Sequence, residues 1–139
     1  MNDLSFSMRQ TEGVVILDLA GRIQLGESSS ELHLNLRSLA AEGKRGVILN
    51  LERVNSIDSC GLGALVAGYT TFERSGGRLK LINLSPKIAE LITVTRLYLL
   101  FETFEDEDLA IASFKKLGRH FKQPQVRAAR VGVDDSSIL

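Results

Sequence analysis

Apolar residues alternate with polar ones through residues 4–10, which is the period of a half-buried β-strand. A turn at residues 11–13 separates this segment from residues 14–20, which are rich in β-branched and other apolar side chains. Two such segments joined by a short turn containing glycine predict a β-hairpin. Gly21 should end the second strand, and residues 22–26 should form a loop or a brief strand.

The next segments carry apolar residues at three- and four-residue spacing, which predicts helices. Ser28 followed by Glu31 fits a capping box, so we expect the first helix to begin at Ser28 and to end near Gly43. A second helix is expected over residues 62–74, before the glycine pair 76–77. Small residues along this second helix should let its backbone lie close to the sheet.

Further along the chain, Ser85 followed by proline predicts the start of a third helix. Acidic residues 106–108 suit the first turn of a fourth helix, where the helix dipole favours negative charge. Between the helices, we expect a central strand at residues 47–51 that is buried on both faces. Two more strands are expected at residues 78–84 and near residues 101–104.

Strands that alternate with helices favour an α/β domain with a mixed sheet. The 139 residues suit a single domain, which we place at residues 1–117. The pattern fails from Gly118 onward, so residues 118–139 are expected to form a flexible C-terminal tail.

Composition narrows the class of protein. Basic and acidic residues both number 17, so the formal net charge is zero, which argues against direct binding to nucleic acid. No apolar run approaches the length of a membrane span, and the N-terminus lacks the layout of a secretory signal. Cys60 is the single cysteine, which excludes an internal disulfide and any metal site built from several thiolates. We therefore expect a cytoplasmic protein without a bound metal or cofactor.

The chemistry-bearing side chains gather at the junction between the central strand and the second helix. Asp58, Ser59 and Cys60 precede Gly61 and Gly63 at this point. Backbone N–H groups at a helix start are unpaired and attract anions. Asp and Ser are also preferred N-cap residues, so a purely structural role is the competing interpretation. We expect Ser59 to serve as an N-cap whose hydroxyl is also displayed at the surface.

The junction matches no catalytic motif. Ile57 stands where a nucleophile elbow needs glycine, no phosphate loop is present, and Val66 occupies the third glycine position of a dinucleotide fingerprint. His33 falls within the first helix and His120 in the tail, so neither is placed to serve as a base. Cys60 is interpreted as a small core residue rather than a reactive thiol. We therefore expect a protein that is not an enzyme.

The run at residues 57–65, Ile-Asp-Ser-Cys-Gly-Leu-Gly-Ala-Leu, resembles the signature of STAS domains, specifically the bacterial anti-sigma factor antagonists. The resemblance extends from about residue 4 to residue 117. It includes co-linear segments at residues 19–23, 46–51, 76–81, 85–86 and 100–101. It implies a STAS-like mixed sheet of four to five strands, with about four helices packed mostly on one face.

The resemblance also implies a function. An unphosphorylated antagonist binds an anti-sigma factor that is a serine kinase, and thereby releases the sigma factor for transcription. Phosphorylation of the serine after the aspartate switches binding off, and a protein phosphatase restores it. On this chain the phosphoacceptor is Ser59, and the implied partner-binding residues also include Asp58, Cys60, Gly61, Leu62 and Gln24. The chain is expected to be a monomer or a weak dimer.

Two residues depart from the family pattern. Cys60 replaces the usual second hydroxyl residue, and Gln24 stands where many antagonists carry an acidic side chain. Other roles known for STAS domains therefore stay open. These are a non-switching scaffold or subunit of a stress-signalling assembly or lipid transporter, and a small-molecule sensor.

Overall fold

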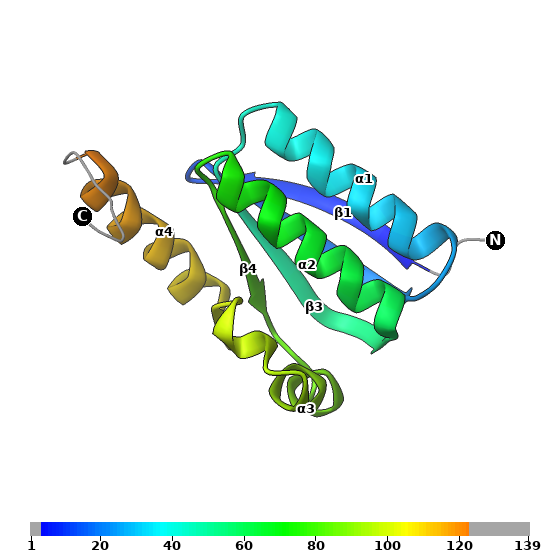
Figure 1. The fold of residues 1–139 in the computed structure, drawn as a ribbon. Coiled ribbons are helices and arrows are strands. Elements are labelled where there is room, and N and C mark those ends of the chain that lie inside the picture. The colour runs from blue at the N-terminus through cyan, green and yellow to red at the C-terminus, as the bar shows by residue number, and fades with distance from the viewer. Residues whose placement is uncertain (1–3, 123–139) are drawn as a thin grey trace.

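A computed structural model describes residues 4–122 of the chain. Five strands form one mixed sheet in the spatial order β1-β2-β3-β4-β5 (Figure 1). Their bounds are β1 Leu4–Thr11, β2 Val14–Ile23, β3 Gly46–Ile57, β4 Arg78–Ile82 and β5 Thr103–Phe104. Because the spatial order repeats the order in sequence, each new strand is added to the same side of the sheet.

The sheet is mixed because it opens with a hairpin. β1 and β2 pair antiparallel through a two-residue turn, whose residues Glu12 and Gly13 both have positive φ, 52° and 81°. This combination is typical of a type I′ turn. β2, β3, β4 and β5 then pair parallel to one another. The predicted hairpin and α/β class are confirmed.

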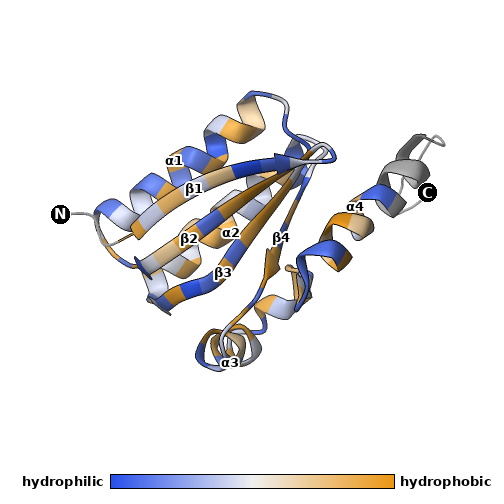
Figure 2. Ribbon diagram, turned by 180° about the vertical axis from the view of Figure 1, so that it is seen from behind, coloured by the Kyte–Doolittle hydropathy of each residue, from blue (hydrophilic) through white to orange (hydrophobic). Residues whose placement is uncertain are grey.

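Helices cover the two faces of the sheet unequally (Figures 1 and 2). Their bounds are α1 Glu27–Ala41, α2 Ser59–Arg74, α3 Pro86–Val94 and α4 Glu107–Lys122, with a single 3₁₀ turn at Leu97–Leu99. Side chains of α1, α2 and α3 share the larger core with one face, whereas α4 packs on the other. The expected arrangement of about four helices, mostly on one face, is therefore confirmed.

β3 is the central strand that both cores share. Val47 and Leu49 point into the larger core, and Ile48 points into the smaller core beneath α4. All three are fully buried, as expected of a strand covered on both faces. Ala110 and Ile111 of α4 are buried against Ile48, which fixes the last helix to the sheet.

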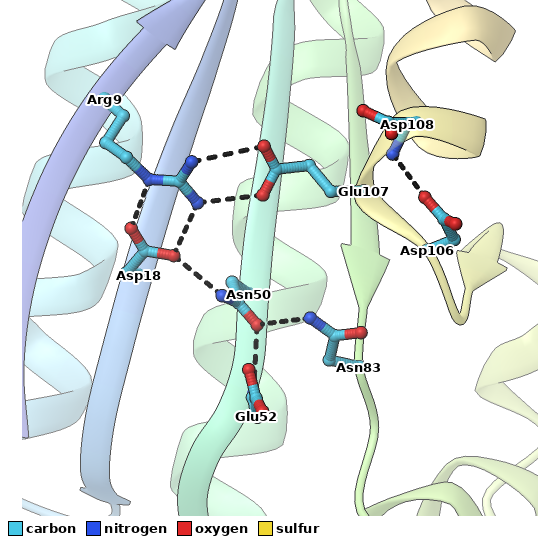
Figure 3. A network of polar contacts seen from close by, with 8 residues as sticks. All are labelled: Arg9, Asp18, Asn50, Glu52, Asn83, Asp106, Glu107 and Asp108. Atoms are coloured by element: carbon cyan, nitrogen blue, oxygen red, sulfur yellow. Dashed lines mark hydrogen bonds and ion pairs between the residues drawn. The ribbon is translucent and has the colours of Figure 1, made fainter.

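The face that carries α4 also holds a chain of polar contacts (Figure 3). The Arg9 guanidinium donates to both oxygens of Asp18, at 2.6 and 2.9 Å, and to both oxygens of Glu107, at 3.1 and 2.9 Å. Asp18 also accepts from Asn50, which accepts in turn from Asn83. These contacts tie β1, β2 and β3 to the start of α4.

This network shifts the acid–base behaviour of its charged members. Hydrogen bonds from Arg9 are the main cause that holds the pKa of Asp18 below its ordinary value. Asp18 and Glu107 in turn raise the pKa of Arg9. The ion pairs are partly exposed to solvent, so their contribution to stability is modest.

Two expectations about the elements were wrong. Ser28 does not cap α1, because the helix begins at Glu27 after an N-cap at Gly26 that makes no side-chain hydrogen bond. The central strand does not stop at residue 51, since β3 continues to Ile57 beside β2, which itself runs past Gly21. Two register shifts in the β2–β3 pairing accommodate this extension.

The end of the chain departs in a smaller way from the expected pattern. The apolar segment before α4 forms a 3₁₀ turn and then the two-residue strand β5. α4 continues through Gly118 to Lys122. The remainder of the predicted tail, residues 123–139, lies outside the described residues.

Candidate functional site

The candidate site lies where two neighbouring parallel strands end and two helices begin (Figure 1). The loop from β2 into α1 and the junction from β3 into α2 are adjacent, because Ile23 and Ile57 are paired in register. The structure therefore brings Gln24 next to residues 58–62, although they are more than thirty residues apart in sequence.

Asp58 holds the two loops together. It is the N-cap of α2, and its Oδ1 accepts from the backbone N–H of Gly61 at 2.9 Å. Its Oδ2 accepts from the backbone N–H of Leu25 in the other loop, also at 2.9 Å. Its own N–H donates to the Ile23 carbonyl at 3.1 Å. One exposed carboxylate thus fixes both the helix start and the neighbouring loop.

These backbone contacts keep Asp58 ionised. The N–H of Gly61 is the largest cause that lowers the pKa of Asp58, followed by the N–H of Leu25. Both N–H donors stabilise the charged carboxylate more strongly than the protonated carboxylic acid.

Ser59 is the first residue of α2 and is exposed. The expectation that Ser59 is an N-cap was wrong, since Asp58 occupies that position. Within residues 4–122 the Ser59 hydroxyl makes no hydrogen bond, so it is available to a partner in solution. A serine at this position lies beside the positive end of the helix dipole and the unpaired N–H groups of the first turn.

Gly61 is required by close packing rather than by an unusual backbone conformation. An added Cβ would lie 2.3 Å from the Ile23 carbonyl oxygen and 2.9 Å from a methyl carbon of Ile57. Gly63 differs, because a Cβ there would meet nothing within 4 Å. Gly61 therefore allows α2 to begin against the end of β2.

Leu62 and Cys60 flank this glycine with different exposure. Leu62 is half-buried and packs against the larger core, so part of its side chain is accessible at the surface. The interpretation of Cys60 as a core residue was wrong, since its side chain is exposed. In the first turn of a helix, sequence spacing alone does not determine which residue faces the core.

The loop that carries Gln24 is held by the serine that was expected to cap α1. The Ser28 hydroxyl accepts from the Gln24 N–H at 2.8 Å and donates to the Gln24 carbonyl at 3.0 Å. Ser28 is buried and Gln24 is half-buried. The backbone of the loop is thereby fixed next to Asp58.

A shallow groove of about 600 Å³ runs between α1 and α2 beside Ser59. His33 contributes to its wall and is half-exposed, as expected for a residue within the first helix. The residues that line the groove are Ser29, Ser30, His33, Leu34, Cys60, Gly63, Ala64 and Ala67. Most of these side chains are small, which leaves the groove open to solvent.

Sequence reasoning missed an apolar patch that follows α3. Val94, Tyr98, Leu99 and Leu100 are 67%, 54%, 72% and 37% exposed, respectively. Val94 and Ile57 line one hollow of about 260 Å³, which places the patch at the same end of the sheet as Asp58. The signal was present in the sequence as an apolar run at residues 97–101 with no clear period.

Residues 4–122 hold neither a metal-binding cluster nor a membrane-spanning helix. They contain no group of three or more His, Cys, Asp or Glu side chains placed to hold a metal ion. They also contain no helix that is long and apolar enough to cross a membrane.

Comparisons with known proteins identify relatives of the chain. The model of the STAS domain family matches residues 5–110. The anti-sigma-B factor antagonist of Bacillus subtilis is 32% identical over 95 residues, which cover 68% of this chain and 85% of the relative.

Solved structures show the same fold. The anti-sigma factor antagonist SpoIIAA in its unphosphorylated form gives a TM-score of 0.64 at 21% identity, over 80% of this chain and 98% of the other. The Bacillus cell fate determinant SpoIIAA in its phosphorylated form gives a TM-score of 0.62 at 22% identity, over 79% of this chain and 99% of the other. At this level of identity the likeness establishes the fold.

Proposed function

The chain belongs to the STAS domain family, and on that premise we propose that it is an anti-sigma factor antagonist switched by phosphorylation of Ser59. In its unphosphorylated form it binds an anti-sigma factor that is also a serine kinase, and the bound sigma factor is released. The kinase phosphorylates Ser59 and ends the complex, and a protein phosphatase restores the original state.

The observation that carries this proposal is that the Ser59 hydroxyl is both exposed and, among residues 4–122, without a hydrogen bond. Its side chain is exposed, and its hydroxyl makes no hydrogen bond within the described part of the chain. Asp58 next to it is held by two backbone N–H groups and so presents the serine in a fixed loop. A kinase needs an accessible hydroxyl on a defined backbone, and this junction supplies both.

The modified domain should keep its fold. A phosphate at Ser59 would add a charge of about −1.5 to −2 at the start of α2, where the helix dipole and unpaired N–H groups favour an anion. The serine hydroxyl supports no other part of the structure among residues 4–122. Phosphorylation therefore acts on the partner rather than on the stability of the domain.

A bound partner would be affected much more strongly. An interface centred on Ser59 would have to desolvate the phosphate next to the ionised Asp58 carboxylate. A hundredfold loss of affinity corresponds to only about 2.7 kcal/mol. One poorly solvated charge is enough to supply that, so no refolding is needed.

The contact surface we propose extends to both sides of Ser59. Leu62 presents a half-buried apolar side chain beside it, and Leu25 in the adjacent loop is 76% exposed. Gln24 and Cys60 lie in the same loops and would contact the partner without adding negative charge. We also assign to this contact surface the exposed apolar patch of Val94, Tyr98, Leu99 and Leu100, which lies at the same end of the sheet.

The test is incubation of the purified chain with its cognate anti-sigma factor kinase and ATP, followed by intact mass measurement. We expect one phosphate on the wild-type chain and none on Ser59→Ala. Ser59→Asp should bind the kinase about a hundredfold more weakly than wild type. Ser38→Asp is the matched control, because it adds the same charge at an exposed serine that makes no side-chain hydrogen bond within the described residues and lies toward the end of α1 remote from Ser59.

Other outcomes would redirect the proposal. Phosphorylation that persists in Ser59→Ala would reject Ser59 as the acceptor. A stable complex that is indifferent to ATP and to Ser59→Asp would instead support a non-switching scaffold or subunit.

A further inference from the structure

β1 is an edge strand, and the outer side of its residues 6–10 is paired with no strand in the described part of the chain. It has eight residues and forms a continuous antiparallel ladder with β2, without any register shift. Figure 2 shows β1 at the border of the sheet, with α4 near the opposite border. At that border the edge strand β5 has only two residues. The sheet thus has one long open edge within residues 4–122.

The hairpin geometry determines which backbone groups face outward. In a two-residue type I′ hairpin, the residues flanking the turn, here Thr11 and Val14, form a hydrogen-bonded pair, and such pairs alternate along the ladder. Ser7 and Arg9 therefore direct their N–H and C=O groups toward β2. Phe6, Met8 and Gln10 direct theirs away from the sheet, where no strand receives them.

This edge lacks the features that normally prevent pairing with another strand. Proteins guard exposed edges with lysine, proline, bulges or very short strands. β1 contains neither lysine nor proline, and its ladder is regular. Its one charged residue, Arg9, is engaged by Asp18 and Glu107. Met8 is 60% exposed although it is apolar.

We propose that β1 pairs antiparallel with β1 of a second copy of this chain, about a two-fold axis at Ser7. Phe6 of each copy then forms a hydrogen-bonded pair with Met8 of the other, which uses the outward N–H and C=O groups of both residues. The two five-stranded sheets become one continuous sheet. This surface is separate from the Ser59 site and does not depend on the proposed switch.

The side chains favour a second copy as the occupant. With the axis at Ser7, two apolar pairs of Phe6 with Met8 lie on the face that carries α1 and α2. On the other face Ser7 meets Ser7, and Ser5 meets Arg9, so no like charges are opposed. An axis at Met8 would instead place the partly exposed Phe6 opposite the polar Gln10, whereas the axis at Ser7 sets Gln10 against Leu4, whose side chain is buried in the larger core. An axis at Phe6 would shorten the paired segment of β1 from residues 4–10 to residues 4–8. The register at Ser7 therefore combines the longer ladder with apolar pairs at its centre.

The first test is sedimentation of the full chain over a wide range of concentrations. We expect reversible dimers in the wild-type chain and at least about tenfold weaker association in Met8→Pro, since the proline removes an outward N–H from each copy. The β2 ladder should survive this change, because the Met8 N–H faces away from it. Met8→Lys is a second variant that keeps the backbone intact and should weaken association by placing a charge opposite Phe6. Thermal unfolding of both variants verifies that they are folded.

The second test fixes the register by cross-linking in a Cys60→Ser background. Ser7→Cys should form a disulfide-linked dimer under copper phenanthroline, because the two-fold axis places the two cysteines directly opposite each other. Ser5→Cys is the matched control and should not cross-link, since it faces Arg9. Equal cross-linking of both variants would overturn the proposal, as would a dimer that persists unchanged in Met8→Pro. A chain that stays monomeric at every concentration would also overturn the proposal. In that case the open edge of β1 would be a site for an extended segment of another protein.

Discussion

Two serines near the candidate site, Ser28 and Ser59, differ in burial and in hydrogen bonding. In the first turn of α1, Ser28 is buried and its hydroxyl makes two hydrogen bonds to the Gln24 backbone. In the first turn of α2, Ser59 is exposed and its hydroxyl makes none within the described residues. Ser28 stabilises the fold through its hydrogen bonds, whereas the Ser59 hydroxyl is displayed at the surface. The same residue type thus has a structural role at the start of α1 and an accessible hydroxyl at the start of α2.

Asp58 explains how the second serine can remain uncommitted. It performs the capping task at α2 and also binds the neighbouring loop, so the Ser59 hydroxyl is not needed for either. Gly61 lets the two loops approach closely enough for this arrangement. Substitutions at the residues that hold the two loops together therefore test whether Ser28 is structural and Ser59 is not.

The largest expected effect is that of Gly61→Ala. The new methyl would clash with the Ile23 carbonyl and force the loops apart, which should cost about 3 kcal/mol of unfolding free energy. Chemical denaturation measures this loss. Gly63→Ala is the matched control, since the new methyl meets nothing and should stabilise the helix by about 0.5–1 kcal/mol. Equal stability of the two variants would show that the loops are not tightly packed.

A smaller loss is expected from Ser28→Ala. Removing its hydroxyl takes one hydrogen bond from the Gln24 N–H and one from the Gln24 carbonyl, which still accepts from the Ser29 N–H, and should cost about 1–2 kcal/mol. Ser59→Ala should change stability by less than about 0.5 kcal/mol. Urea denaturation of both variants compares the two serines directly. A larger loss from Ser59→Ala than from Ser28→Ala would reverse the assignment of their roles.

The contribution of Asp58 should depend on pH. Its pKa is lowered in the folded state, so its stabilising contacts are fully present above the unfolded carboxyl pKa of about 3.9. The contribution is lost as the pH falls through the lower folded pKa. Asp58→Asn should therefore unfold at a lower temperature than wild type at pH 7, and the difference should shrink as the solution is acidified. A difference that stays constant with pH would contradict the assignment of this carboxylate as the charged cap.

The smallest effect is expected from Cys60→Ser. The side chain is exposed, so the unfolding free energy should change by less than about 0.5 kcal/mol. The variant also supplies the second hydroxyl that is typical of the family. Intact mass after kinase treatment should still show a single phosphate, and peptide mapping should place it at residue 59. A phosphate found at residue 60 instead would show that the kinase does not select residue 59 over residue 60 by its backbone position.

Much of the fold could be predicted from local pattern. Alternation marked β1, the spacing of apolar residues marked α2, and Ser85 with Pro86 marked the start of α3, where the Ser85 hydroxyl accepts from the Ile88 N–H. These signals act over a few residues, so they survive without knowledge of the neighbours. The junction at residues 58–62 was identified from the same kind of signal.

The errors arose where a residue's role depends on a distant segment. Ser28 has the spacing of a capping box, but its hydroxyl is taken by Gln24 in the preceding loop. The second bond of Asp58 goes to Leu25, which is 33 residues away in sequence. The extension of β3 depends on pairing with β2. None of these contacts can be deduced from periodicity.

The bond between Arg9 and Glu107 joins residues 98 positions apart, and this separation has a consequence for folding during synthesis. The hairpin forms from adjacent residues, and each later strand is added at one growing border, so the sheet can assemble in the order in which the ribosome delivers it. Arg9 can bind Asp18 early, but it must wait for Glu107 until nearly the whole domain has emerged. The last helix is therefore a completion step, and a nascent chain that stalls before residue 107 would leave the apolar surface beneath α4 uncovered.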